Sequence, residues 1–217
     1  MRQPAAAEAT TCSMNMEISF WKTVIPTGRT TILTGLCVTS GCFPNMFRQK
    51  KLQIEFLNKW RNTNKYKGEV FAPENYSFEY LFATTLAGQP LAWMEGTNLP
   101  EEAFTLREHT EAYKKFQHDM HSGTILPIGD EPSGRSWTGF QSLKKDRGYL
   151  IVYRENHPEG TAEVETWLPE GVTVRCTPLM GHGKAMTAVT GKKGRLEISL
   201  PSINDYVVYK YEIKNKR

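Results

Sequence analysis

A series of short apolar segments, each followed by turn residues, constrains the fold of this chain most strongly. Between residues 136 and 213, Gly, Pro, Asn or Asp separates nearly all of these segments. Short runs at such even spacing are typical of two packed antiparallel sheets. Within residues 196–200 apolar and polar side chains alternate, which gives a strand one buried and one solvated face. The sequence therefore predicts an antiparallel β-sandwich with strands at 136–142, 149–154, 161–167, 172–177, 185–189, 195–200 and 206–213.

The chain before this sandwich has a more helical character. Residues 49–64 place apolar side chains on one broad face and lysines largely elsewhere, which predicts an amphipathic helix. A second helix is predicted at 76–88, and its low charge indicates burial on more than one side. Pro100 begins a third predicted helix, which reaches 118–121. Residues 126–134 are rich in turn formers and predict a connector to the sandwich.

The first 47 residues follow neither a helical nor a strand period, so they stay unassigned and are expected to be poorly ordered in part. Three of the four cysteines, Cys12, Cys37 and Cys42, lie here, and Cys176 lies in the sandwich. Cys37 and Cys42 could pair, which the sequence leaves open. Since no CxxC motif is present, free thiols are the better interpretation.

Charge and composition exclude several classes of function. The chain has 27 basic and 23 acidic residues, a net charge of +4 that is too small and too dispersed to predict a nucleic-acid partner. The uncharged segment 31–47 contains Gly, Pro, Thr and Ser and makes a poor membrane span. The N-terminus lacks the apolar core of a secretory signal, and the location of the protein stays open. No phosphate loop, nucleophile elbow or zinc-protease motif is present, so we predict no cofactor and no metal.

Five segments of the chain carry a resemblance to a known family. They are residues 52–58 (Leu-Gln-Ile-Glu-Phe-Leu-Asn), 71–73 (Phe-Ala-Pro), 82–95 (Phe-Ala-Thr-Thr-Leu-Ala-Gly-Gln-Pro-Leu-Ala-Trp-Met-Glu), 139–142 (Gly-Phe-Gln-Ser) and 148–154 (Gly-Tyr-Leu-Ile-Val-Tyr-Arg). The first three resemble the last part of an α-galactosidase-like glycoside hydrolase. The last two are similar to the start of the β-sandwich that closes such enzymes. The resemblance covers about residues 51–214.

In such families a (β/α)8 barrel carries the chemistry and the sandwich packs against it. The resemblance makes 90–95 the eighth barrel strand and 76–88 the helix before it. It divides the chain into an unassigned segment at 1–47, the last βα units of a barrel-like domain at 48–123, and a C-terminal antiparallel β-sandwich at 124–217. The predicted fold class is α+β, with a helical, partial (β/α)-barrel part followed by the sandwich.

The apolar run at 89–95 predicts a buried strand, and candidate substrate-binding residues lie at its end. Because barrel enzymes place functional groups at the C-terminal ends of strands, these candidates are Trp93, Glu95 and Asn98. Trp93 either stacks on a sugar or packs in the core, Glu95 contacts substrate or is solvated, and Asn98 binds a hydroxyl or supports the turn. The two catalytic carboxylates of the family come from earlier strands and have no match here, so no catalytic residue is named.

Two further groups of residues have both a structural and a functional interpretation. His118, Asp119 and His121 form a compact titratable cluster at a predicted helix end. The i, i+3 histidines suit a shared metal, although cationic histidines at a helix C-terminus are the commoner explanation. Arg135 and Trp137 are expected to anchor the sandwich to the helical part.

Two kinds of function fit these observations. The first is a C-terminal fragment of a glycoside hydrolase resembling α-galactosidases, which would hydrolyse O-glycosidic bonds when whole and be inactive alone. The alternative is a non-catalytic carbohydrate-binding or structural β-sandwich module. The candidate partners are a galactoside-like carbohydrate, and a second copy or another protein at the exposed seam of a partial barrel. Nucleic acid and a membrane span are not expected, and the full-length family is often exported.

Overall fold

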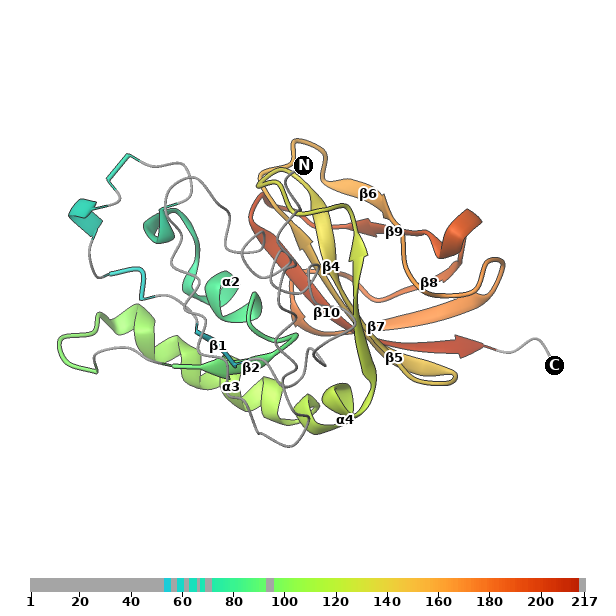
Figure 1. The fold of residues 1–217 in the computed structure, drawn as a ribbon, viewed down its shortest axis with the longest axis horizontal. Helices are drawn as coiled ribbons and strands as arrows, with labels where there is room; N and C mark the ends of the chain where they lie inside the picture. The colour runs from blue at the N-terminus through green and yellow to red at the C-terminus, as the bar shows by residue number, and fades with distance from the viewer. Residues whose placement is uncertain are drawn as a thin grey trace, which may run out of the picture.

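The computed structural model describes residues 53–55, 58–60, 63–65, 67–68, 72–92 and 96–214 of the chain. Within these residues the fold is mostly antiparallel sheet with three α-helices, which fits the α+β class (Figure 1). Six strands form one sheet in the order β3-β4-β5-β10-β7-β8, and all neighbours are antiparallel. Their bounds are Thr124–Gly129 (β3), Trp137–Leu143 (β4), Arg147–Arg154 (β5), Thr173–Gly181 (β7), Met186–Val189 (β8) and Asp205–Lys214 (β10).

A smaller antiparallel sheet packs on one face of this large sheet. It consists of β6 (Thr161–Val164) and β9 (Leu196–Ser199), and the 3-10 helix η5 (Lys192–Gly194) precedes β9. Each of the seven predicted strands coincides with an observed strand, although β6 is shorter than the predicted segment. The two packed antiparallel sheets predicted from turn spacing are therefore confirmed.

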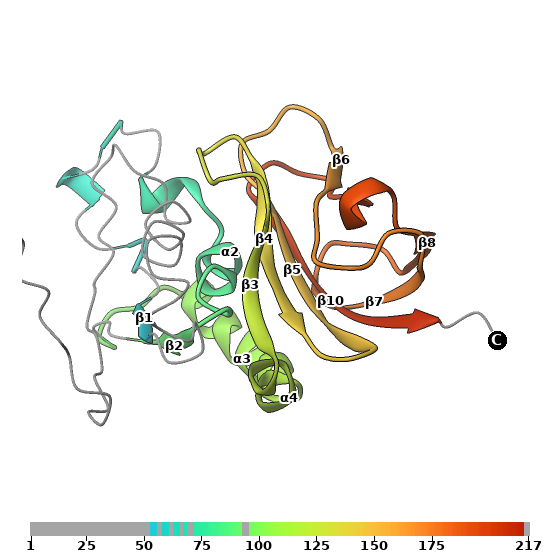
Figure 2. The ribbon, with the colours of Figure 1, turned by 45° about the vertical axis from the view of Figure 1, so that its right-hand side comes forward.

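Alternation along the central strands divides the buried side chains between two faces. On β5, Leu150 and Val152 point into the space between the two sheets, whereas Tyr149, Ile151 and Tyr153 belong to a second core on the opposite face. The core between the sheets contains Ile128, Trp137, Leu150, Val152, Val164, Leu168, Val174, Cys176, Leu196, Ile198, Leu200, Val207, Tyr209 and Tyr211. The large sheet is thus the middle of three layers (Figure 2).

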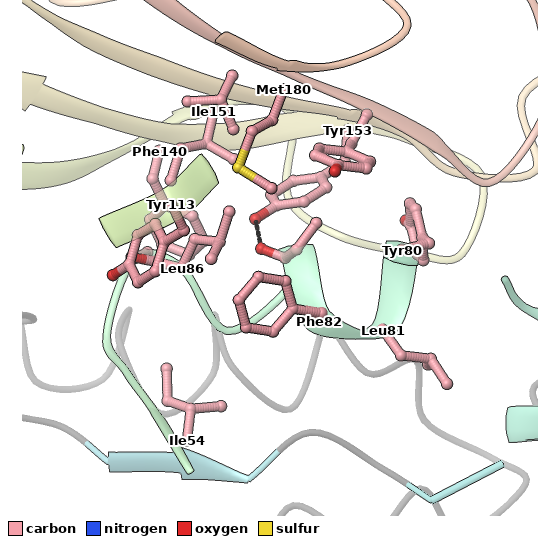
Figure 3. Packing of buried hydrophobic residues seen from close by; sticks show 14 of the residues in the cluster. Ile54, Tyr80, Leu81, Phe82, Leu86, Tyr113, Phe140, Ile151, Tyr153 and Met180 are labelled. Atoms are coloured by element: carbon pink, nitrogen blue, oxygen red, sulfur yellow. Dashed lines mark hydrogen bonds between the residues drawn. The ribbon is translucent and has the colours of Figure 1, made fainter. Parts of the chain in front are cut away.

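The third layer is helical and covers the face of the large sheet that β6 and β9 leave free (Figure 2). In chain order it contains β1 (Gln53–Glu55), η2 (Thr63–Lys65), η3 (Pro73–Asn75), α2 (Phe78–Ala83), β2 (Gln89–Leu91), η4 (Glu101–Thr105), α3 (Leu106–Lys114) and α4 (Gln117–Ser122). Figure 3 shows Phe82 and Leu86 of this layer facing Phe140, Ile151 and Met180 of the sheet. The helices and the sheet consequently share one hydrophobic core.

The helix α2 is buried on more than one side, as its low charge predicted. It lies between the large sheet and the strand β1, and its Ala83 is fully buried (Figure 3). The helix begins after Ser77, whose hydroxyl accepts a hydrogen bond from the Tyr80 amide at 3.1 Å. It ends earlier than predicted, because the hydroxyls of Thr84 and Thr85 bond back to carbonyls of the last turn at 2.7 Å.

The strands β1 and β2 pair in parallel, with Ile54 opposite Pro90. Parallel neighbours need a crossover connection, and α2 lies within it, so this part of the chain is a β-α-β unit. The described residues do not show a barrel. The predicted strand at 89–95 is confirmed for Gln89–Leu91, but its predicted burial is wrong because these residues are half-buried.

The prediction of an amphipathic helix at 49–64 is wrong where the structure describes it. Gln53–Glu55 is a strand and Thr63–Lys65 is a 3-10 helix. The apolar side chains do mark a buried position, since Ile54 is in the core. Pairing with β2 satisfies the backbone here, and this tertiary contact prevails over helical spacing.

The predicted connector at 126–134 is also wrong in part, because Thr124–Gly129 is the strand β3. Pro127 made this segment look like a turn, but β3 is an edge strand with one side free of partners in the sheet. An edge strand tolerates proline since the missing N–H need not join a ladder. Gly129, with φ +72°, ends the strand.

The third predicted helix is divided into η4, α3 and α4. The break between α3 and α4 falls at Phe116, whose φ of −127° and ψ of −7° are not helical. Phe116 is buried and stacks on Tyr149 of β5, so the break follows the packing of its ring on the sheet. Among the described residues, no helix has the length and apolar character to traverse a lipid bilayer.

Candidate functional site

The structure describes only one of the three predicted binding residues. Trp93 and Glu95 lie outside the described residues, so their roles stay predictions. Asn98 is exposed in the loop between β2 and η4, with φ +53°. Asn tolerates this left-handed conformation better than most residues, which suits a turn. Its role in binding also stays a prediction.

The cluster of His118, Asp119 and His121 is divided between different environments. His118 is exposed, whereas His121 is buried, with Nε2 2.8 Å from the Tyr113 hydroxyl and 3.1 Å from the Leu86 carbonyl. A carbonyl only accepts, so Nε2 donates to it. His121 therefore joins the last turn of α4 to the turn after α2, and its interpretation as a cation at the helix end stays a prediction. In the described part of the chain, no three His, Cys, Asp or Glu side chains gather as a metal site.

Asp119 instead pairs with the large sheet. Its carboxylate lies 2.5 Å from the Lys144 ammonium and accepts a hydrogen bond from the Tyr149 hydroxyl at 2.7 Å. These two hydrogen bonds, with Lys144 the larger cause, lower the pKa of Asp119. Burial, followed by the bond to Asp119, raises the pKa of Tyr149, so its hydroxyl stays a donor.

Two other tyrosines of the sheet also donate hydrogen bonds to the helical layer. The Tyr153 hydroxyl donates to the Ala83 carbonyl at 2.7 Å, and the Tyr206 hydroxyl donates to the Glu79 carboxylate at 2.5 Å. We call Tyr149, Tyr153 and Tyr206 the tyrosine layer. Tyr149 reaches α4, Tyr153 reaches the end of α2, and Tyr206 reaches its start. The helical layer is therefore fixed to the sheet by polar contacts as well as by packing.

A second group of titratable side chains lies at the edge of the tyrosine layer. The His182 Nδ1 is 2.7 Å from the Asp205 carboxylate, and the same oxygen accepts from the Tyr206 amide at 2.7 Å. The hydrogen bond to Asp205 raises the pKa of His182, and the charge of Glu79 adds to this. Asp205 is buried and His182 is exposed, so this ion pair closes the β7–β8 turn over the start of β10.

Glu155 is the least exposed carboxylate in the described part of the chain. It is 3% exposed, and one oxygen accepts from the amides of Ser133, Gly134 and Ser136 at 3.1, 2.7 and 2.9 Å. Three convergent amides form a concave anion site, and here a side chain of the same chain fills it. Glu155 therefore organises the loop between β3 and β4.

The predicted anchoring residues lie elsewhere than expected. Trp137 is buried in the core between the two sheets and not against the helices, so its anchoring prediction is wrong. Strand alternation explains this. Trp137 is opposite Arg154, and the neighbouring Tyr153 points to the other face of the sheet, where the helices lie. Arg135 is exposed. Cys176 is buried, which raises the pKa of its thiol to about 12 and makes it unreactive.

The site residues that the sequence did not indicate are those that act at long range. Glu155 meets amides about twenty positions earlier, and Tyr206 meets Glu79 of α2. The alternation of 149–154 already separates Tyr149 and Tyr153 from Leu150 and Val152, so it was the available signal for the tyrosine layer. Nothing in the local pattern identifies their partners.

The described residues define a class of fold, namely an antiparallel two-sheet domain with a helical layer on its outer face. No protein-family model matches the chain, and no curated protein matches it in sequence. Among solved structures, the chain is similar to the galactosidase domain of the α-galactosidase–sucrose kinase AgaSK, with a TM-score of 0.58 and 14% identity. The match covers 85% of this chain and 25% of that chain.

An α-amylase from Anoxybacillus is a weaker match, with a TM-score of 0.49 and 14% identity over 76% of this chain and 39% of that chain. This second likeness supports no argument. The first shows a shared fold, and the chain spans about a quarter of the length of the solved chain it matches.

Proposed function

We propose that the chain forms the C-terminal part of an α-galactosidase-like glycoside hydrolase and that its sheets close the enzyme. The observation that carries this proposal is the β1-α2-β2 unit fixed to the large sheet. Parallel strands joined by a helix are the repeating unit of a (β/α)8 barrel. The shared core and the tyrosine layer join this unit to the antiparallel sheets.

The sheets have a supporting role in this proposal. Retaining hydrolysis needs two carboxylates roughly 5 Å apart on either side of the scissile bond. In the structure, Asp119 and Glu155 are engaged in hydrogen bonds that hold elements together, and so is Asp205. We therefore assign no catalytic step to the sheets, and we expect the chain to be inactive without the earlier barrel strands.

The loop after β2 would contribute substrate contacts in the complete enzyme. It follows the C-terminal end of a parallel strand, where barrel enzymes bind their substrates. Trp93, Glu95 and Asn98 are the residues assigned to this contact. Their partners on the other barrel strands would supply the catalytic carboxylates.

Turnover of an aryl α-galactoside tests the proposal. The purified chain is expected to release no nitrophenol from 4-nitrophenyl α-galactoside above the rate in buffer. Glu95→Gln is the matched variant and should behave in the same way. Robust turnover by the chain, abolished in Glu95→Gln, contradicts the proposal because catalysis would then reside in these residues.

A further inference from the structure

An exposed tryptophan lies on the side of the molecule that carries the smaller sheet. Trp167 is 57% exposed and follows β6, and β6 lies on the side of the large sheet opposite to α2 (Figure 2). An exposed indole offers a large apolar surface with a polar N–H edge to an occupant. The other exposed large apolar side chains of the described residues are Phe104, Val189 and Ile203, and none of them is an indole.

The ring of Trp167 is held in a fixed orientation. Its Nε1 donates a hydrogen bond to the Pro127 carbonyl at 2.8 Å, and its amide donates to the Gln141 side chain at 2.8 Å. Gln141 is fully buried and in turn donates to the Tyr211 hydroxyl at 3.2 Å. The polar edge of the indole is thus satisfied within the protein. An occupant would meet a rigid apolar face with little loss of side-chain entropy on binding.

Charged side chains share the outward-facing positions of this segment with Trp167. Residues alternate between outward and inward positions from β6 onward, so Glu163, Glu165 and Trp167 point outward. Arg195, which precedes β9, lies 3.5 Å from the Glu165 carboxylate and 3.9 Å from that of Glu163. Lys193 lies 3.8 Å from Glu165. We call Glu163, Glu165, Trp167, Lys193 and Arg195 the Trp167 face.

We propose that the Trp167 face binds a pyranose ring of a carbohydrate. A pyranose has an apolar face of C–H groups, which suits stacking on the indole, and a rim of hydroxyls. The Glu165 carboxylate accepts hydrogen bonds from such hydroxyls, and the Arg195 guanidinium donates to them. Both charged groups are exposed enough to exchange water for sugar.

The surroundings of the ring favour a sugar over a protein partner. The centre of a protein interface is depleted of charged residues and contains several apolar side chains. Here the exposed positions of the segment carry one aromatic ring and two carboxylates, and these carboxylates pair with cations. The proposal does not depend on whether the chain closes a larger enzyme or acts as a β-sandwich module by itself.

Titration of the full chain with melibiose, raffinose and maltoheptaose tests this proposal, with the indole N–H resonances followed by NMR. At least one of these sugars is expected to bind saturably and to shift the indole resonance of Trp167. This resonance is identified as the one that disappears in the spectrum of Trp167→Ala. Trp167→Ala is expected to weaken binding about tenfold or more, since the stacked apolar area is lost. Trp167→Phe retains a flat ring and should keep part of the affinity.

Val189→Ala, on the exposed edge strand β8, is the matched control and should bind as the wild type does. Glu165→Gln should weaken binding without removing the ring, and it serves as the second variant if Trp167→Ala does not fold. The proposal is wrong if none of the three sugars binds saturably, or if both variants bind as tightly as the wild type. It is also wrong if analytical ultracentrifugation without sugar finds self-association that Trp167→Ala abolishes. Because these readouts do not involve hydrolysis, their failure is distinct from failure of the proposed function.

Discussion

The carboxylate of Glu155, which follows β5, should stabilise the β3–β4 loop more than any single side chain of that loop does. One of its oxygens accepts from three backbone amides, and two of these, in Gly134 and Ser136, are in buried residues. In Glu155→Ala these amides lose their acceptor and cannot be fully hydrated. At about 1–3 kcal/mol for each of these two unsatisfied buried groups, we expect a loss of about 2–6 kcal/mol in the free energy of unfolding.

The conservative variant gives a graded test of this reasoning. Glu155→Gln keeps one acceptor oxygen but loses the charge, and charge-assisted hydrogen bonds are about twice as strong as neutral ones. We therefore expect about half of the loss seen for Glu155→Ala. Since about 1 kcal/mol shifts the melting temperature by about 2–4 °C at this size, the alanine variant should melt about 4–24 °C lower.

Urea and thermal unfolding followed by far-UV circular dichroism measure both quantities. Glu159→Ala is the matched control, because Glu159 is an exposed glutamate four positions later in the sequence. This control is expected to change the free energy of unfolding by about 0.5 kcal/mol or less. If Glu155→Ala is as stable as Glu159→Ala, the three amide contacts do not hold the loop and the reasoning is refuted.

Three further predictions concern the contacts between the layers and the core. Tyr153→Phe removes the hydrogen bond to the Ala83 carbonyl and should lower the free energy of unfolding by about 1–2 kcal/mol in urea titrations, and an unchanged midpoint would refute the contact. His182→Gln should destabilise the protein most at low pH, because Asp205 raises the pKa of His182 in the folded protein. The ion pair is therefore fully stabilising below the ordinary pKa of 6.5, and this stabilisation is lost as the pH rises through the raised pKa. Melting temperatures between about pH 5 and pH 9 measure this difference, and a difference that grows with pH would contradict the pairing. Cys176 should resist alkylation in the folded protein at neutral pH and react in urea, as measured by peptide mass spectrometry, so labelling of the native thiol would show that it is not buried.

The sequence predicts the sheets well because their signals are local. Alternation and turn residues repeat along each strand, and every segment expected from them is a strand in the structure. Gly139 and Gly148, which carry part of the family resemblance, have a physical explanation. An added Cβ at Gly139 would overlap the Ile151 carbonyl, and one at Gly148 would overlap the Ser142 carbonyl, so both strands approach too closely for any other residue.

The wrong predictions arise where tertiary contacts decide the local structure. Ile54 was placed on a helix, but pairing with the strand after α2 makes it part of a parallel ladder. Pro127 indicated a turn, and only the position of β3 at a sheet edge makes it compatible with a strand. These outcomes depend on which elements become neighbours, and the local pattern of residues does not show that.

The candidate site is predicted less well than the fold. Of the three predicted binding residues, only Asn98 is among those described, and its contact with a ligand stays a prediction. For Trp167, the available signal was its position in phase with Glu163 and Glu165, which strand alternation turns toward solvent. The signal identifies an exposed ring but not the contact with Pro127 that fixes it.

The expected self-association through a barrel seam also stays a prediction. It depends on the free edges of the parallel pair β1 and β2, which the two-stranded ladder leaves without further strands in the described part of the chain. Analytical ultracentrifugation across a range of protein concentrations measures it directly.

The central proposal is that this chain forms the closing part of a glycoside hydrolase whose catalytic strands precede it in the full-length protein. Sequencing the genomic DNA upstream of the Met1 codon tests this claim most directly. The account predicts an open frame, continuous with Met1, that encodes further β-α units and two carboxylates at strand ends. A stop codon in frame immediately upstream, together with a ribosome-binding or promoter signal for Met1 itself, would contradict it.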